Sequence, residues 1–206
     1  MSATMTILFG TVIVSLIAFR DRRLFVGMLF EPFVVASRNQ WYRTVSHAFI
    51  HADLPHLFVN MFVLYMFGPR VETFLGALTG MNSAMMMTSL YVSAAVVASI
   101  PAFHKHRFDP NYRSLGASGA VSAVLFAHIL MFPTSPVYLF LLPVPIPSML
   151  FGALYLGLEW YMDKRGGDGV AHDAHFFGAI YGVLFTAIAE PGLVFRFGSF
   201  ESSVIG

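Results

Sequence analysis

The stretch "RSLGASGAVSAVLFAHILMF", residues 113–132, is apolar enough over most of its length to cross a bilayer. It begins, however, with small residues around one hydroxyl, because Ser118 lies in the middle of "GASGA" at 116–120. A serine in an apolar helix usually bonds to its own backbone and serves as a small packing residue. Whether Ser118 does more depends on which other polar residues reach the same depth.

The composition indicates an integral membrane protein. Of the 206 residues, 57% are hydrophobic and only 11% are charged, whereas about a quarter of the residues of a soluble domain are charged. The formal net charge of +1 gives no sign of a nucleic-acid partner, so the lipid bilayer is the first partner expected. The absence of cysteine excludes thiol catalysis and cysteine-based metal sites.

Six apolar runs approach the roughly 20 residues that a bilayer core requires. They predict helices near 3–19, 54–72, 80–102, 115–132, 147–162 and 173–190. The first run lacks the basic start and the cleavage site of a signal peptide, so we expect it to be retained. Prolines in "FPTSP" and "PVPIP" interrupt the chain after the fourth run, and "VYLFLL" between them is too short to span. The expected fold is an all-α membrane protein with six transmembrane helices in a single domain, residues 1–206.

The second, fourth and sixth predicted helices run in the same direction, so their N-terminal ends lie at one membrane face. The unusual polar residues gather at these ends, namely His47, His51, His56, Asn60, Ser118, His172 and His175. Ionisable groups inside a membrane are costly, and they normally face the bundle interior or a water-filled cavity. Three separate segments therefore supply polar groups to one depth.

Helical spacing refines this placement. His56 and Asn60 are four residues apart and share a face, as do His175, Gly178 and Gly182. The two glycines form a G-x-x-x-G pair, which most often means close packing of another helix. If that helix is 115–132, His175 is carried toward Ser118. A hydroxyl, a general base and donors for an oxyanion are what nucleophilic acyl transfer needs.

Five segments resemble the rhomboid intramembrane serine proteases in the order of that family. They are "WYR" at 41–43, "HAFIHADLPHLFVN" at 47–60, "GPRVETFLG" at 68–76, "GASGA" at 116–120 and "AHFFGAIYG" at 174–182. The resemblance covers nearly the whole chain. It implies a rhomboid-like six-helix bundle and a serine endopeptidase that cleaves transmembrane protein substrates near the membrane surface.

The resemblance also implies roles for individual residues. Ser118 becomes the nucleophile and His175 the general base of a Ser-His dyad that lacks an aspartate. The backbone N–H of Ser118, together with His56 and Asn60, would form the oxyanion hole. Structural roles fall to Arg43, His51, Glu72, Gly178 and Gly182. The substrate would enter past a loop whose freedom to move comes from Gly166, Gly167 and Gly169. No metal and no cofactor is expected.

Ser122 and Glu159 are two further polar residues within the predicted helices. The family usually carries an aromatic residue four positions after the nucleophile, and this chain has Ser122 there, which we expect to bond to its own helix. Glu159, near the end of the fifth predicted helix, is interpreted as an exposed interfacial carboxylate.

Two other function classes remain open. The first is a catalytically inactive rhomboid-like factor that binds membrane proteins, although such a factor normally loses the serine or the histidine. The second is a metal-dependent membrane hydrolase or transporter, built on His47, His51, His56, His172, Asp173 and His175. The chain has no H-E-x-x-H motif to support it.

The orientation in the membrane is predicted differently by two arguments. Ten of the twelve Lys and Arg residues lie on the loops at the face of Ser118, and Arg70 and Arg196 lie on the other. The positive-inside rule would place the Ser118 face in the cytoplasm. The family implies the opposite, with a cytoplasmic N-terminus, and we follow the family. The expected location is a multi-pass protein of a prokaryotic inner membrane.

Overall fold

The computed structural model describes residues 1–139, 142–166 and 170–195, and these are mostly helical. In chain order the elements are α1 (Ala3–Ala18), α2 (Arg22–Met28), α3 (Pro32–Arg38), α4 (Arg43–Ser46), the 3-10 helix η1 (His47–Phe49), α5 (Leu54–Thr79), α6 (Ser83–His106), α7 (Ser118–Met131), β1 (Pro136–Leu139), β2 (Leu142–Pro147), α8 (Ser148–Arg165), α9 (His172–Ala189) and α10 (Gly192–Phe195).

Each of the six predicted ranges contains one long helix, and the differences lie at the ends. α5 continues past residue 72 to Thr79, where Gly80 takes a left-handed conformation with φ of 65° and stops the helix. α7 begins at Ser118 rather than at residue 115. This later start places Ser118 in the first turn of α7.

The prediction of an all-α chain was incomplete. Where the prolines predicted only a break, β1 and β2 form an antiparallel pair in which Pro136 lies opposite Pro147. Ser148 closes the base of this hairpin, because its hydroxyl contacts the carbonyl oxygens of Phe132 at 2.7 Å and Ser135 at 2.6 Å. The hairpin leads directly from α7 into α8.

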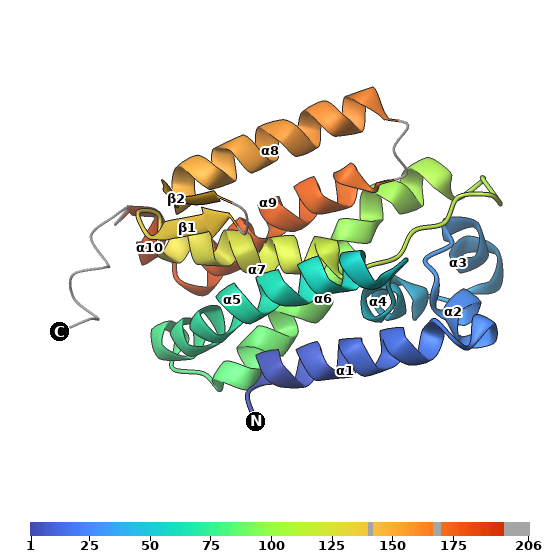
Figure 1. Cartoon of the computed structure of the whole chain (residues 1–206), viewed down its shortest axis with the longest axis horizontal. Helices are drawn as coiled ribbons and strands as arrows, with labels where there is room; N and C mark the ends of the chain where they lie inside the picture. The colour runs from blue at the N-terminus through green and yellow to red at the C-terminus, as the bar shows by residue number, and fades with distance from the viewer. Residues whose placement is uncertain (140–141, 167–169, 196–206) are drawn as a thin grey trace.

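α7 is the central helix of the bundle. Every residue from Gly119 to Met131 is buried, whereas α8 buries only Ser148, Gly152 and Glu159. A helix that is apolar on all sides is expected in the interior of a protein. Figure 1 shows α7 in the middle of the view, with α8 along one edge and α1 along the opposite edge.

The closest helix contact joins α7 to α9. A Cβ atom built on Gly178 would lie 2.1 Å from the carbonyl oxygen of Gly119, and one built on Gly182 would lie 2.1 Å from that of Ala123. No side chain fits at either position, so the two backbones touch. This contact sets the first turn of α9, which carries His175, beside the first turn of α7.

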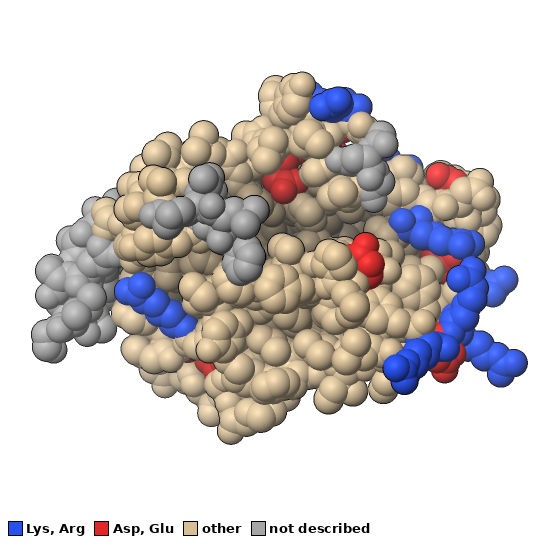
Figure 2. Space-filling view, in the orientation of Figure 1, with Lys and Arg blue, Asp and Glu red and all other residues tan. Residues whose placement is uncertain are grey.

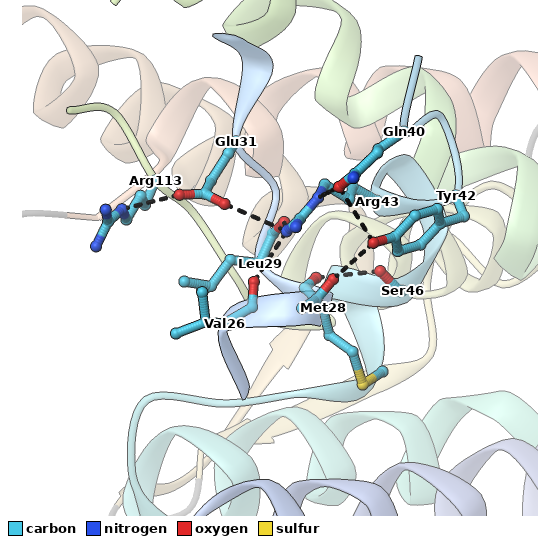
Figure 3. A network of polar contacts seen from close by, with 10 residues as sticks. Val26, Met28, Leu29, Glu31, Gln40, Tyr42, Arg43, Ser46 and Arg113 are labelled. Atoms are coloured by element: carbon cyan, nitrogen blue, oxygen red, sulfur yellow. Dashed lines mark hydrogen bonds and ion pairs between the residues drawn. The ribbon is translucent and has the colours of Figure 1, made fainter. Parts of the chain in front are cut away.

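Arg43 organises the region between α1 and α5 (Figure 3). Its Nη1 donates to the carbonyl oxygens of Val26 at 2.9 Å and Leu29 at 2.7 Å, and its Nε donates to Gln40 Oε1 at 2.7 Å. Arg43 also lies 3.3 Å from the carboxylate of Glu31. One buried guanidinium therefore holds α2, α3 and α4 together.

The same network reaches the segment that precedes α7. Glu31 forms a second ion pair, at 3.0 Å, with Arg113. Phe30 and Ser114 exchange two backbone hydrogen bonds of 3.0 Å each. The region between α1 and α5 is thus tied to the chain four residues before Ser118.

Length and hydropathy mark α6 as a candidate membrane span among the described residues. α5 passes the same test only together with Arg43–Phe49, from which it is bent by 97°. α1 and α7 are apolar but shorter. The six-span topology therefore stays a prediction.

The contact between α7 and α9 can be tested by adding single methyl groups. We expect Gly178→Ala and Gly182→Ala each to lower the free energy of unfolding by about 1–3 kcal/mol, because a methyl group at either site overlaps a backbone oxygen of α7. Thermal unfolding in detergent measures this loss. Gly157→Ala is the matched control, since a Cβ there has nothing within 4 Å. Equal melting temperatures for all three variants would contradict the contact.

Candidate functional site

A cavity of about 640 Å³ lies where the N-terminal ends of α5, α7 and α9 meet the side of α8. Figure 2 shows the surface hollowed beneath α8. The polar side chains that line the cavity include Asp53, His56, Asn60, Arg113, Ser118, Ser122, Tyr155, Glu159 and His175. All four residues predicted for the dyad and the oxyanion hole are in this set.

Ser118 is the first residue of α7, and its position gives it backbone donors. The first N–H groups of a helix have no partner within the helix, and the helix dipole favours negative charge beside them. Among the described hydrogen bonds, none uses the N–H of Ser118 or Gly119. The Ser118 hydroxyl therefore stands next to free N–H groups that face the same end of α7.

The turn before Ser118 requires glycine at residue 116. Gly116 has φ of 114°, which L side chains rarely adopt. A Cβ atom there would also lie 2.7 Å from Cε1 of His56. The N–H of Gly116 donates to the carbonyl oxygen of His47 at 3.0 Å. The backbone of this turn is thus packed directly on the His56 ring.

His51 supports the same turn from behind. The N–H of Ala117 donates to His51 Nε2 at 3.3 Å, so the ring proton belongs on Nδ1. Nδ1 lies 3.0 Å from Ser15 Oγ, and the Ser15 hydroxyl donates to the carbonyl oxygen of Phe49 at 3.0 Å. Burial, together with the smaller effect of nearby His56, lowers the pKa of His51 to about 3. His51 is therefore a neutral, fully bonded link between α1 and the serine turn.

Asn60 and His56 approach the cavity from α5. Asn60 is buried and donates one Nδ2 hydrogen to the carbonyl oxygen of His56 at 2.9 Å. The second Nδ2 hydrogen remains for a group in the cavity, since an amide nitrogen carries two. Asp53 caps the start of α5 by accepting from the N–H of His56 at 2.8 Å.

His175 faces the cavity and contacts a carboxylate of α8. Its Nδ1 lies 3.1 Å from Glu159 Oε1, although the ring N–H is not aimed linearly at the oxygen. The other oxygen, Oε2, lies 2.6 Å from His172 Nδ1. Glu159 is 7% exposed, so its interpretation as an exposed interfacial carboxylate was wrong. It lies seven residues after Gly152 on the narrow stripe of α8 that is buried, a spacing that the sequence already contains.

Ser118 and His175 line the same cavity without a hydrogen bond between them in the described structure. Hydrogen bonds of catalytic groups are often long or poorly aligned before substrate binds. The structure thus brings the predicted pair to one cavity, and their chemistry stays a prediction.

Ser122 does not bond to its own helix, which corrects the expectation. Its hydroxyl lies 2.7 Å from Tyr155 OH on α8. Position 122 carries no aromatic ring in this chain, and the hydroxyl of Tyr155 on α8 lies against Ser122. Among the described ring contacts, His175 meets His172, with centroids 5.9 Å apart.

The six residues of the metal hypothesis are not gathered in one place. The described residues hold one group with metal-ligand spacing, Glu159, His172 and His175, whose ligand atoms lie within 4.8 Å of one another. In the structure the carboxylate lies against both imidazoles. His51 is already bonded to Ala117 and to Ser15.

The remaining predicted residues have structural surroundings or lie outside the described ranges. Glu72 accepts hydrogen bonds from the N–H groups of Ala3 and Thr4, both at 2.8 Å, and so caps α1. Gly166 ends α8 with φ of 59°. Gly167 and Gly169 of the predicted gate lie outside the described residues.

Comparison with known proteins gives several relatives. The chain is 28% identical over 168 residues to RHOMBOID-like protein 12, mitochondrial, of Arabidopsis thaliana, covering 74% of this chain and 47% of that protein. It is 30% identical over 151 residues to Rhomboid protein 1, mitochondrial, of Saccharomyces cerevisiae, covering 68% and 40%. It is 23% identical over 95 residues to Putative rhomboid protease YdcA of Bacillus subtilis, covering 46% and 43%.

This chain spans less than half the length of each of these relatives. The mitochondrial names conflict with the prokaryotic inner membrane expected from the sequence. The family model of the Rhomboid domain matches residues 38–191, which include every predicted dyad and oxyanion-hole residue. The chain belongs to the rhomboid family.

Proposed function

We propose that this protein is an intramembrane serine endopeptidase that hydrolyses a peptide bond in or near a transmembrane segment of its substrates. The observation that carries the proposal is the cavity that Ser118, His175, Asn60 and His56 line together at the start of α7. These four residues come from three helices, and each brings a group that acyl transfer requires.

The proposal includes a bundle in which α1, α5, α6, α7, α8 and α9 span the bilayer. Large apolar side chains are exposed along α8, among them Leu150, Leu154 and Leu158, each more than half exposed. An apolar face of this size is unusual in water and suits lipid. In Figure 2 the Lys and Arg side chains gather mainly at the end of the molecule that carries α2 and α3. Such a separation of a charged end from an apolar body fits a membrane protein.

In the proposed mechanism, Ser118 Oγ attacks the carbonyl carbon of the scissile bond while the His175 ring takes the hydroxyl proton. The tetrahedral oxyanion accepts hydrogen bonds from the Ser118 N–H, from Asn60 Nδ2 and from His56. Collapse of this intermediate breaks the C–N bond, and protonated His175 gives its proton to the leaving amine. An ester on Ser118 remains.

Water completes the cycle. A water molecule loses a proton to His175 and attacks the ester, and the second collapse returns the proton to Ser118 Oγ. The polar rim of the cavity, which includes Asp53 and Arg113, gives water a route to residues in the first turn of α7. The carboxyl product then leaves.

The dyad is tested by single and double substitution. We expect Ser118→Ala and His175→Ala each to abolish cleavage of a single-span membrane protein in detergent, and the double variant to be no worse, since groups that act as a unit are not additive. A fluorophosphonate should label the wild type on Ser118, and this labelling should require His175. Gel analysis and mass spectrometry measure both.

Ser89→Ala and His104→Ala, exposed positions on α6, are controls that should keep full activity. A folded wild-type protein that neither cleaves nor reacts, yet binds the substrate equally well after Ser118→Ala, would contradict the proposal. That result would favour the catalytically inactive binding factor.

Asn60 tests the oxyanion hole separately. Asn60→Ala removes one donor and should lower kcat by roughly 10²- to 10³-fold, the usual cost of such a donor. The variant should stay folded, which the thermal unfolding midpoint checks. Full activity in folded Asn60→Ala protein would exclude Asn60 from the site.

The orientation is tested with single cysteines, because the chain has none of its own. Lys105→Cys lies near the cavity end of α6, and Met81→Cys lies in the turn between α5 and α6, at the other end. We expect an impermeant maleimide to label residue 105 in intact cells and residue 81 only after lysis. The opposite pattern would show that the positive-inside rule governs this chain.

A further inference from the structure

We propose that Glu159 is a positioning residue, which holds His175 through Nδ1 so that Nε2 faces Ser118. This inference rests on the proposed function and extends its dyad to a relay of serine, histidine and glutamate. It gives a role to Glu159, which the sequence analysis interpreted as an exposed interfacial carboxylate.

The geometry begins with the burial of Glu159. A carboxylate that is 7% exposed must be compensated, because an unpaired buried charge is costly. Both of its oxygens face imidazole nitrogens, Oε1 at 3.1 Å from His175 Nδ1 and Oε2 at 2.6 Å from His172 Nδ1. A carboxylate accepts hydrogen bonds and cannot donate them, so each Nδ1 that bonds to it carries a hydrogen.

This arrangement favours one tautomer of His175. With the hydrogen on Nδ1, the lone pair of a neutral ring lies on Nε2, where a general base must accept the proton of Ser118. A carboxylate behind the ring also stabilises the imidazolium that forms during attack. The angle at Nδ1 does not meet hydrogen-bond geometry in this structure, and hydrogen bonds of catalytic groups often become aligned only when substrate binds.

His172 and Tyr155 keep the carboxylate in place. His172 lies on α9 one turn before His175, and its short contact occupies Oε2, which leaves Oε1 directed at His175. Tyr155 lies one turn before Glu159 on α8 and is tied to α7 through Ser122 at 2.7 Å. The carboxylate is thus set by contacts of its own helix with both helices that carry the dyad.

The experiment compares Glu159→Gln, which keeps the shape and removes the charge, with Asp163→Asn, an exposed carboxylate one turn further along α8. Glu159→Gln should lower kcat by roughly 10- to 10³-fold with little change in KM, and Glu159→Asp should restore part of it. Asp163→Asn should match the wild type.

The split between kcat and KM separates positioning from a merely structural role. Loss of a group that only supports the fold lowers the unfolding midpoint, whereas loss of a group that orients the general base lowers kcat in folded protein and leaves KM nearly unchanged. The other titratable groups that line the cavity or contact His175 in the described structure are Asp53, His56, Arg113, Tyr155 and His172, and every variant keeps them. Folded Glu159→Gln protein with wild-type kcat would overturn the inference.

An inactive wild type and a metal-dependent wild type would each have a separate meaning. If the wild type cleaves nothing, the proposed function fails, and the inference is then decided by nitrogen-15 NMR of histidine-labelled protein. The Nδ1–H signal of His175 should be present and should be lost in Glu159→Ala; an unchanged signal would overturn it. If EDTA abolishes wild-type activity, or one zinc ion per chain binds only when Glu159 is present, the three residues form a metal site and the inference is wrong.

Discussion

The backbones of α7 and α9 touch, and this contact determines how the helices around the cavity are arranged. Gly178 and Gly182 allow the carbonyl oxygens of Gly119 and Ala123 to approach to a distance that any side chain would prevent. Helices normally pack 8–10 Å apart because side chains separate them, and small residues shorten that distance. This close approach brings Ser118 and His175, in the first turns of the two helices, to one cavity.

The contact between α7 and α9 sets the positions of these two helices, and the turn before Ser118 sets the position of the serine. Three other segments hold this turn: His51 through the N–H of Ala117, His47 through the N–H of Gly116, and Phe30 through Ser114. Each link satisfies a backbone group that would otherwise be buried without a partner. The segments between α1 and α5, which carry no predicted catalytic group, therefore act on the site by placing its backbone.

The features that could be predicted from the sequence are those that depend on apolar runs and on residue spacing within a single helix. Apolar runs gave the ranges of the long helices, and the spacing of His56 and Asn60 gave a shared face that does line the cavity. Patterns within one helix cannot show which residue of a second helix lies opposite. The contacts of Ser122 with Tyr155 and of Glu159 with His175 join α8 to α7 and α9, so they depended on packing that spacing alone does not encode. The hairpin after α7 was missed because its prolines match a break as well as an edge strand.

The roles of two buried glutamates in this chain, Glu72 and Glu159, differ because different groups contact their carboxylates. Glu72 lies toward the far end of α5 from the site and is bonded to backbone N–H groups and to the hydroxyl of Thr4. None of these donors changes its charge near neutral pH, so the contacts of Glu72 hold α1 in place. Glu159 lies against two imidazoles, the side chains whose charge changes most readily in that range. A buried carboxylate between such partners gains and loses interaction energy as protons move. That coupling is what a proton-transferring site needs and what a purely structural ion pair lacks.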